Sequence, residues 1–172
     1  MRMVDRFAGS IADKQGRIIW FAITLFALAA LATGAWFVFG PSGVSGAAKA
    51  DAGNPALVAR GSEVYSSFCA ACHGARLEGQ PNWRRRLPNG RLPAPPHDES
   101  GHTWHHPDKV LFEIVMDGAA KHAPEGYQSD MPGFRGVLSE SDIAAVLAFI
   151  KSRWPTAVRN RHERLNTNAG PS

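Results

Sequence analysis

The residues with the most definite chemistry are Cys69, Cys72 and His73, in the stretch Cys-Ala-Ala-Cys-His. Two thiols three positions apart, followed at once by a histidine, form the C-x-x-C-H pattern typical of covalent haem attachment. Each thiol can add to one of the two vinyl groups of a haem, and the histidine is then placed to bind the iron. The chain has 2 cysteines in all, so both belong to this pattern.

Three other interpretations of the cysteine pair are weaker. A redox-active dithiol of the thioredoxin kind needs a βαβ context, which the sequence does not show. A zinc site needs further ligands, and the chain has no second cysteine pair. A plain structural disulfide remains compatible with an oxidising compartment. The pattern favours haem over these alternatives.

A second ligand for the iron is predicted among the 4 methionines. Met116 lies in an expected helix, where a methionine usually fills the core. Met131 lies in the loop Ser-Asp-Met-Pro-Gly-Phe, where its soft thioether could reach an iron and raise the reduction potential. The alternative is that Met131 packs at the haem edge without bonding, which would leave the iron open to a gas or peroxide.

Two further clusters carry chemistry, and each has a plainer interpretation. The histidines at positions 97, 102, 105 and 106 could bind Cu(II) or Zn(II), or replace Met131 on the iron. They could equally form a polar loop near the haem. Arg84–Arg86 could bind haem propionates, anionic lipid or an acidic partner, or remain a solvated loop.

Helices are the elements expected to position these residues. Asn54-Pro55 predicts the start of a helix that runs to the cysteine motif. Apolar spacing predicts a second helix from Pro107-Asp108 to Gly118 and a third from Ser139 to Trp154-Pro155. No alternating run of strand length is present, so the fold class is all-α. Three helices with long loops bury little apolar surface, which favours a cofactor in the core.

This pattern resembles a class I c-type cytochrome of the membrane-anchored, monohaem bacterial kind, over residues 54–155. Gly61-x-x-Val64-Tyr65 before the cysteine motif is similar to the first helix of that family, and Met131-Pro132 resembles its axial-ligand loop. The resemblance implies a small cytochrome c-like helical domain around one covalently bound haem c. His73 and Met131 would be the axial ligands.

The resemblance also implies two contacts. The first and last helices of the family cross closely, so Gly61 and Tyr65 would meet Val146 and Phe149. A prolyl carbonyl after the motif usually orients the proximal histidine, and Pro81 is the matching residue.

An apolar segment precedes this domain. Ile18–Gly40 is free of charge and, as a helix, would reach about 34 Å, enough to span a hydrocarbon core of about 30 Å. Basic residues concentrate in 1–17, so the positive-inside rule predicts a cytoplasmic N-terminus and a periplasmic domain. Residues 41–53 read as a flexible linker. A cleaved signal peptide is the alternative, although the apolar run is longer than such peptides need.

Charge supports this division of the chain. The net charge is +4, yet residues 51–155 hold 11 basic and 12 acidic residues. The excess lies in 1–17, in the linker and in 156–172, which is predicted as a basic C-terminal tail. The charge therefore indicates membrane topology and not nucleic-acid binding.

The predicted function is one-electron transfer between respiratory or other membrane redox complexes. The chain would be a carrier and not an enzyme, anchored singly in the bacterial cytoplasmic membrane. Its expected partners are membrane lipid and redox proteins, with no nucleic acid and no small-molecule substrate. The alternatives are a haem c subunit fixed in an oxidase or dehydrogenase complex, and a haem-based peroxide- or gas-binding protein if Met131 is not a ligand.

Overall fold

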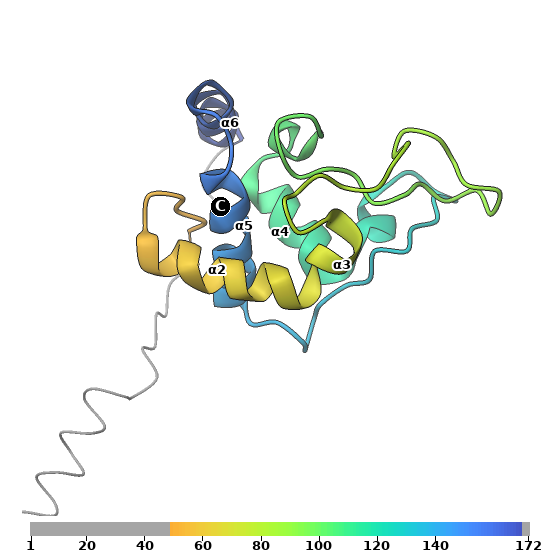
Figure 1. Ribbon diagram of the computed structural model, residues 1–172, viewed down its shortest axis with the longest axis horizontal. Helices are drawn as coiled ribbons and strands as arrows, with labels where there is room; N and C mark the ends of the chain where they lie inside the picture. Colours follow the sequence, from red (N-terminus) through yellow and green to blue (C-terminus); the bar gives the residue numbers. More distant parts are fainter. Residues whose placement is uncertain (1–48, 170–172) are drawn as a thin grey trace, which may run out of the picture. The chain divides into compact units, whose positions relative to one another are not determined.

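The computed structural model describes residues 49–169. The predicted segments 1–17 and 18–40, and most of the linker 41–53, lie outside the described residues. Among the described helices, none is long and apolar enough to cross a membrane. The elements, in chain order, are α2 (Pro55–Phe68), α3 (Ala70–His73), η1 (Thr103–His105), α4 (Asp108–Asp117), η2 (Ala119–His122), α5 (Glu140–Ser152) and α6 (Thr156–Asn168) (Figure 1).

Helices dominate the described part of the chain, as predicted. Between residues 49 and 169 there is no strand, and the β-type pairing there is one isolated bridge between Arg135 and Leu138. Long loops join the helices. The loop that follows α3 extends away from the helices at the right of Figure 1. The prediction of a mostly helical domain is confirmed.

Helix α2 begins where the sequence predicts. Pro55 is its first residue, and the Asn54 side chain accepts hydrogen bonds from the backbone N–H groups of Ala56 and Leu57. The cap satisfies two of the N–H groups that a helix start leaves without partners. Helix α4 likewise ends at Gly118, which has a φ of 90°. Met116 in α4 is 8% exposed, which confirms it as a core residue.

Helices α2 and α5 form the main packing contact, and α2 crosses α5 in Figure 1. A Cβ placed on Gly61 would lie 1.9 Å from the Ala145 carbonyl oxygen and 2.8 Å from the Phe149 Cβ. The ring centroids of Tyr65 and Phe149 are 5.3 Å apart. The predicted crossing is therefore confirmed, with Ala145 rather than Val146 as the residue closest to Gly61. Glycine is needed because the two backbones touch.

Helix α6 corrects the predicted basic C-terminal tail 156–172, because most of that segment is helical. Its one buried residue is His162, whose ring packs edge-on against Trp154 at 5.0 Å. His162 Nε2 donates to the His106 carbonyl at 2.9 Å. Asn166 accepts from the backbone N–H of Asp108 at 2.7 Å. The helix is polar nearly all round, so apolar periodicity could not show it.

Candidate functional site

The cysteine motif occupies the junction between α2 and α3. Cys69 ends α2 by donating its N–H to the Tyr65 carbonyl at 2.9 Å. The Cys69 carbonyl then accepts from the N–H groups of Cys72 and His73, at 3.1 and 2.9 Å. One tight turn thus gathers both thiols and the imidazole, as the spacing predicts.

Both cysteines are free thiols, with Cys69 half-buried and Cys72 exposed. Burial raises the pKa of Cys69 to about 11, with the nearby Cys72 adding to the shift. Redox-active dithiols depend on a lowered thiol pKa, because the thiolate is the reactive form. The raised pKa disfavours the dithiol interpretation, and the free thiols are available for attachment to a haem.

The His73 ring is buried and fixed by a backbone carbonyl. Its Nδ1 lies 2.8 Å from the Pro95 oxygen. A carbonyl oxygen can only accept, so Nδ1 carries the hydrogen and Nε2 carries the lone pair that a metal needs. Burial lowers the pKa of His73, although the Pro95 bond opposes the shift. The ring is therefore neutral at neutral pH and suited to bind iron.

The residue that orients His73 corrects the prediction, because the carbonyl belongs to Pro95 and not to Pro81. After α3 the chain turns, and Gln80 pairs with Ala94 through two hydrogen bonds of 2.9 Å. Residues 81–93 form an excursion beyond this pair, in which Pro81 is exposed. The carbonyl that reaches the imidazole belongs to Pro95, which follows this excursion. Pro81, the first proline after the motif, therefore does not orient His73.

Close backbone contacts fix the returning segment. A Cβ on Gly79 would lie 2.4 Å from the Pro96 nitrogen, and one on Gly101 would lie 2.0 Å from the Pro96 oxygen. Gly79 also has a φ of 67°, which favours glycine. These two approaches clamp the segment that carries the Pro95 carbonyl.

His97, from the predicted histidine cluster, lies beside His73. The ring centroids are 3.9 Å apart and the planes are inclined by 22°. The pKa of His97 is lowered well below its usual value, chiefly by burial and then by the neighbouring His73 and His102. His102 stacks on Trp83 instead.

The metal interpretation of the histidine cluster gains no support. Within residues 49–169 no group of three or more His, Cys, Asp or Glu side chains is arranged to hold a metal ion. The cluster is instead divided among aromatic contacts with different neighbours: His105, for example, stacks on Trp104 at 3.7 Å.

Met131 lies partly buried in the loop between η2 and α5. Its N–H donates to the Ser129 hydroxyl at 3.1 Å. Downstream, the N–H groups of Phe134 and Arg135 donate to the carbonyls of Val115 and Met116 on α4, both at 3.0 Å. These bonds hold the loop against the end of α4.

One aromatic contact joins the Met131 loop to the cysteine motif. Phe68 precedes Cys69 and is 44% exposed, and its ring meets that of Phe134 edge-on at 6.2 Å. The loop that carries Met131 and the end of α2 therefore contact each other through these two rings. Two free thiols and an imidazole with Nε2 available are a donor set that fits haem c.

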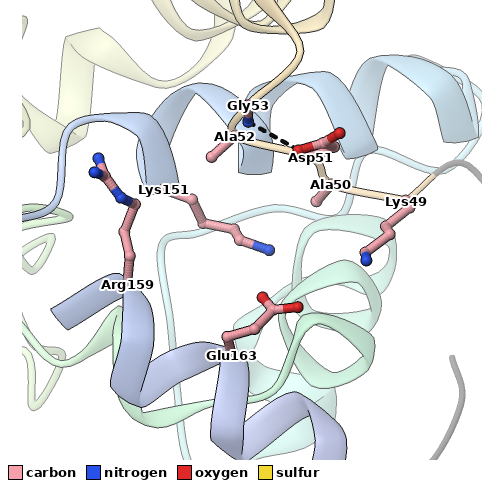
Figure 2. A pocket seen from close by; sticks show the side chains of 8 residues that line it. All are labelled: Lys49, Ala50, Asp51, Ala52, Gly53, Lys151, Arg159 and Glu163. Atoms are coloured by element: carbon pink, nitrogen blue, oxygen red, sulfur yellow. Dashed lines mark hydrogen bonds between the residues drawn. The ribbon is translucent and has the colours of Figure 1, made fainter. Parts of the chain in front are cut away.

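A separate hollow of about 400 Å³ lies between residues 49–53, α5 and α6 (Figure 2). Lys151 and Arg159 line it, but Lys151 donates to the Asp108 carboxylate at 2.6 Å and Arg159 donates to the Trp154 carbonyl at 3.0 Å. Both cations already serve the fold, and no predicted site residue lines the hollow.

Comparisons with known proteins identify the family of this domain. The family model described as cytochrome c matches residues 58–154. Among solved structures, the chain is similar to cytochrome cL from the marine methylotrophic bacterium Methylophaga aminisulfidivorans. The identity is 19%, the match covers 78% of this chain and 85% of that chain, and the TM-score is 0.45. No curated protein matches the sequence.

Proposed function

Because the chain belongs to the cytochrome c family, we propose that it is a monohaem electron carrier anchored in the bacterial cytoplasmic membrane, with its haem domain in the periplasm. Proteins of this family carry haem c attached covalently at a C-x-x-C-H motif. The chain is therefore an electron-transfer haem protein. The identities of the iron ligands, the membrane anchor and the redox partners are proposed in addition to this family assignment.

The observation that carries the proposal is the hydrogen bond from His73 Nδ1 to the Pro95 carbonyl, at 2.8 Å. Such a bond fixes the tautomer and makes the opposite nitrogen a stronger donor to a metal. Cys69 and Cys72 would hold the haem covalently beside it. The bound haem would supply an iron that alternates between Fe(II) and Fe(III).

Met131 is proposed as the second axial ligand. Its sulfur is soft, so it favours Fe(II), and a His/Met ligand pair raises the reduction potential. The loop that carries it is bonded to α4, and its Phe134 contacts Phe68, the residue before the cysteine motif. If Met131 binds the iron opposite His73, the chain would leave no site open to oxygen or peroxide, as a carrier requires.

The sequence is the support for the proposed anchor. Residues 18–40 would span the membrane, with 1–17 in the cytoplasm, and 41–53 would tether the domain. A tether raises the effective concentration of the carrier near membrane-bound partners. The proposed partners are redox complexes of the same membrane.

Covalent attachment is tested by producing the full chain in a bacterium that can mature c-type cytochromes. We expect one haem per chain in a pyridine haemochrome assay, and haem that stays with the polypeptide on a denaturing gel. The double variant Cys69→Ala/Cys72→Ala should lose that haem, while Ser66→Ala, an exposed change in α2, should keep it. Haem absent from the wild-type chain would overturn the proposal.

The anchor is tested by fractionating the same cells. We expect the haem protein to stay with membranes after an alkaline carbonate wash. A version in which a cleavable signal peptide replaces residues 1–40 should appear in the periplasmic fraction. Release of the full chain by the wash would contradict the anchor, and co-elution with a catalytic core in mild detergent would indicate a fixed subunit.

A further inference from the structure

We propose that His97 is a positioning residue that holds the plane of the His73 ring, an inference that rests on the proposed role of His73 as an iron ligand. His97 belongs to the histidine cluster at positions 97, 102, 105 and 106, whose composition suggests metal binding. The geometry points to another use, because its ring lies flat against the His73 ring, which would bind the iron.

Two contacts act on His73 from different directions. The Pro95 carbonyl binds the ring edge at Nδ1, at 2.8 Å. The His97 ring covers one face, with 3.9 Å between centroids and 22° between planes. A single hydrogen bond leaves a ring free to rock about the line that joins its two atoms. A flat neighbour on the ring face removes that freedom.

His97 can serve as a support because it is itself held from three directions. Its N–H donates to the Leu77 carbonyl at 2.8 Å, and its carbonyl accepts from Trp154 Nε1 at 2.7 Å. Its Nδ1 is 2.8 Å from the buried Thr103 hydroxyl. These partners lie in the loop after α3, after α5 and in η1, so the ring is tied to several parts of the domain.

The Pro95 and His97 contacts come from one short segment. Pro95 and His97 are two residues apart, and the backbone between them is pressed against Gly79 and Gly101. A displacement of this segment would therefore disturb both contacts with His73 together. Pro95 and His97 therefore restrain the His73 imidazole together, Pro95 at the ring edge and His97 on one ring face.

The consequence is electronic as well as structural. The direction of an axial imidazole plane determines how it overlaps with the iron orbitals, and partners that fix this plane tune the metal. In an oxidised low-spin haem protein, the electron paramagnetic resonance g values and the pattern of haem-methyl NMR shifts report that direction. These signals distinguish a positioning role from a purely structural one.

The test compares these spectra for the oxidised wild type, His97→Ala, His97→Phe and Thr103→Val. We expect His97→Ala to shift the g values and reorder the methyl shifts. His97→Phe keeps a flat ring but loses the hydrogen bond to Thr103, so it should shift the spectra much less than His97→Ala. Thr103→Val removes the tether on His97 and should shift the spectra less, in the same direction. His105→Ala is the control, since His105 stacks on Trp104 and is exposed.

The outcomes separate this inference from the proposed function. Wild-type spectra from His97→Ala would overturn the role of His97, while a haem bound to the chain would leave the proposed function standing. A wild-type protein without haem, or one whose low-spin spectrum survives His73→Ala, would overturn both. If His97→Ala does not accumulate, His97→Leu replaces it, and identical spectra for the Leu and Phe variants would overturn the inference.

Discussion

At the scale of single residues, the neighbours of the cysteine motif prepare His73 for a metal as much as the motif itself does. The motif brings two thiols and an imidazole into one turn. The Pro95 carbonyl then selects the tautomer with hydrogen on Nδ1. Burial keeps the ring neutral by lowering the pKa of His73. A neutral, oriented imidazole is what an iron ligand requires.

The proposed ligand Met131 leads to a prediction at this scale. Met131→Ala should keep covalent haem but lose the low-spin His/Met absorption spectrum, because the sixth position opens to water. The reduced variant should also bind carbon monoxide, which the wild type should not. The measurement is an absorption spectrum before and after the gas is added. Met116→Leu, a volume-conserving change in the core, is the matched control.

The same scale shows where sequence reasoning succeeds and fails. The motif spacing predicts Cys69, Cys72 and His73 as the haem-attachment residues without any structure, because attachment needs those residues at that spacing. The family resemblance suggests Pro81 as the orienting residue, and this is wrong because the excursion over residues 81–93 is closed by the pairing of Gln80 with Ala94. A contact between residues 22 apart depends on that closure, which no local pattern reports.

At the scale of elements, the crossing of α2 over α5 sets the position of the cysteine motif. Gly61 lets the two backbones touch, and Tyr65 one turn later packs on Phe149. The Tyr65 hydroxyl then donates to the Gly74 carbonyl at 2.9 Å, just after the motif. A shift of this crossing would therefore move the site.

Gly61→Ala tests the crossing. The added Cβ would meet the Ala145 carbonyl, so the helices must separate, and we expect a loss of about 1–3 kcal/mol in the free energy of unfolding. Urea denaturation followed by circular dichroism measures it. Ser62→Ala, an exposed change in the same helix, should alter stability by less than about 0.5 kcal/mol. Equal stability for the two variants would mean that the helices do not touch at Gly61.

The loop after α3 and the loop that carries Met131 contact each other. The excursion after α3 and the loop that carries Met131 run side by side at the right of Figure 1. Arg91 forms an ion pair with Asp130, the residue before Met131. Arg86 lies over the Tyr127 ring, with 5.8 Å to its centroid. The arginine-rich loop thus braces the ligand loop.

Arg91→Ala should loosen that brace. A surface ion pair is worth about 0.2–1 kcal/mol, so the affinity of the oxidised protein for added imidazole should rise roughly 1.4- to 5-fold as Met131 is displaced more easily. Spectroscopic titration with imidazole measures this. Arg85→Ala removes an exposed arginine of the same loop and should have no effect. An equal response of the two variants would show that the ion pair does not hold the loop.

At the scale of the whole domain, α6 closes the structure around a buried polar cluster. Lys151 on α5 donates to Asp108 on α4 at 2.6 Å, and His162 on α6 lies 3.6 Å from the same carboxylate. Three helices therefore meet at one ion pair. Sequence patterning missed α6 because its buried contact is a single histidine, whereas α2, α4 and α5 each bury several apolar residues.

The cluster predicts a pH dependence of stability. Burial is the main reason that the pKa of His162 is lowered, although Asp108 opposes the shift. The unfolded chain, in which a histidine titrates near a pH of about 6.5, then binds the proton more tightly than the folded chain. The contribution of neutral His162 to the free energy of unfolding should therefore be complete above this pH and be lost as the pH falls below it.

Urea denaturation at several pH values between about 7 and 5 measures this loss. His162→Gln should lower stability overall but lose less of it with acid, because the titrating group is gone. His105→Gln, an exposed change in η1, should show the wild-type dependence. A wild-type acid dependence in His162→Gln would contradict the role of the cluster.

The central claim is that the chain moves single electrons through a haem closed on both sides by His73 and Met131. A redox titration of the purified full chain, followed by the absorption bands of haem c, tests it most directly. We predict one reversible one-electron transition, low-spin spectra in both states, and no change when carbon monoxide is added to the reduced protein. A high-spin oxidised spectrum, or ready binding of carbon monoxide, would contradict the account.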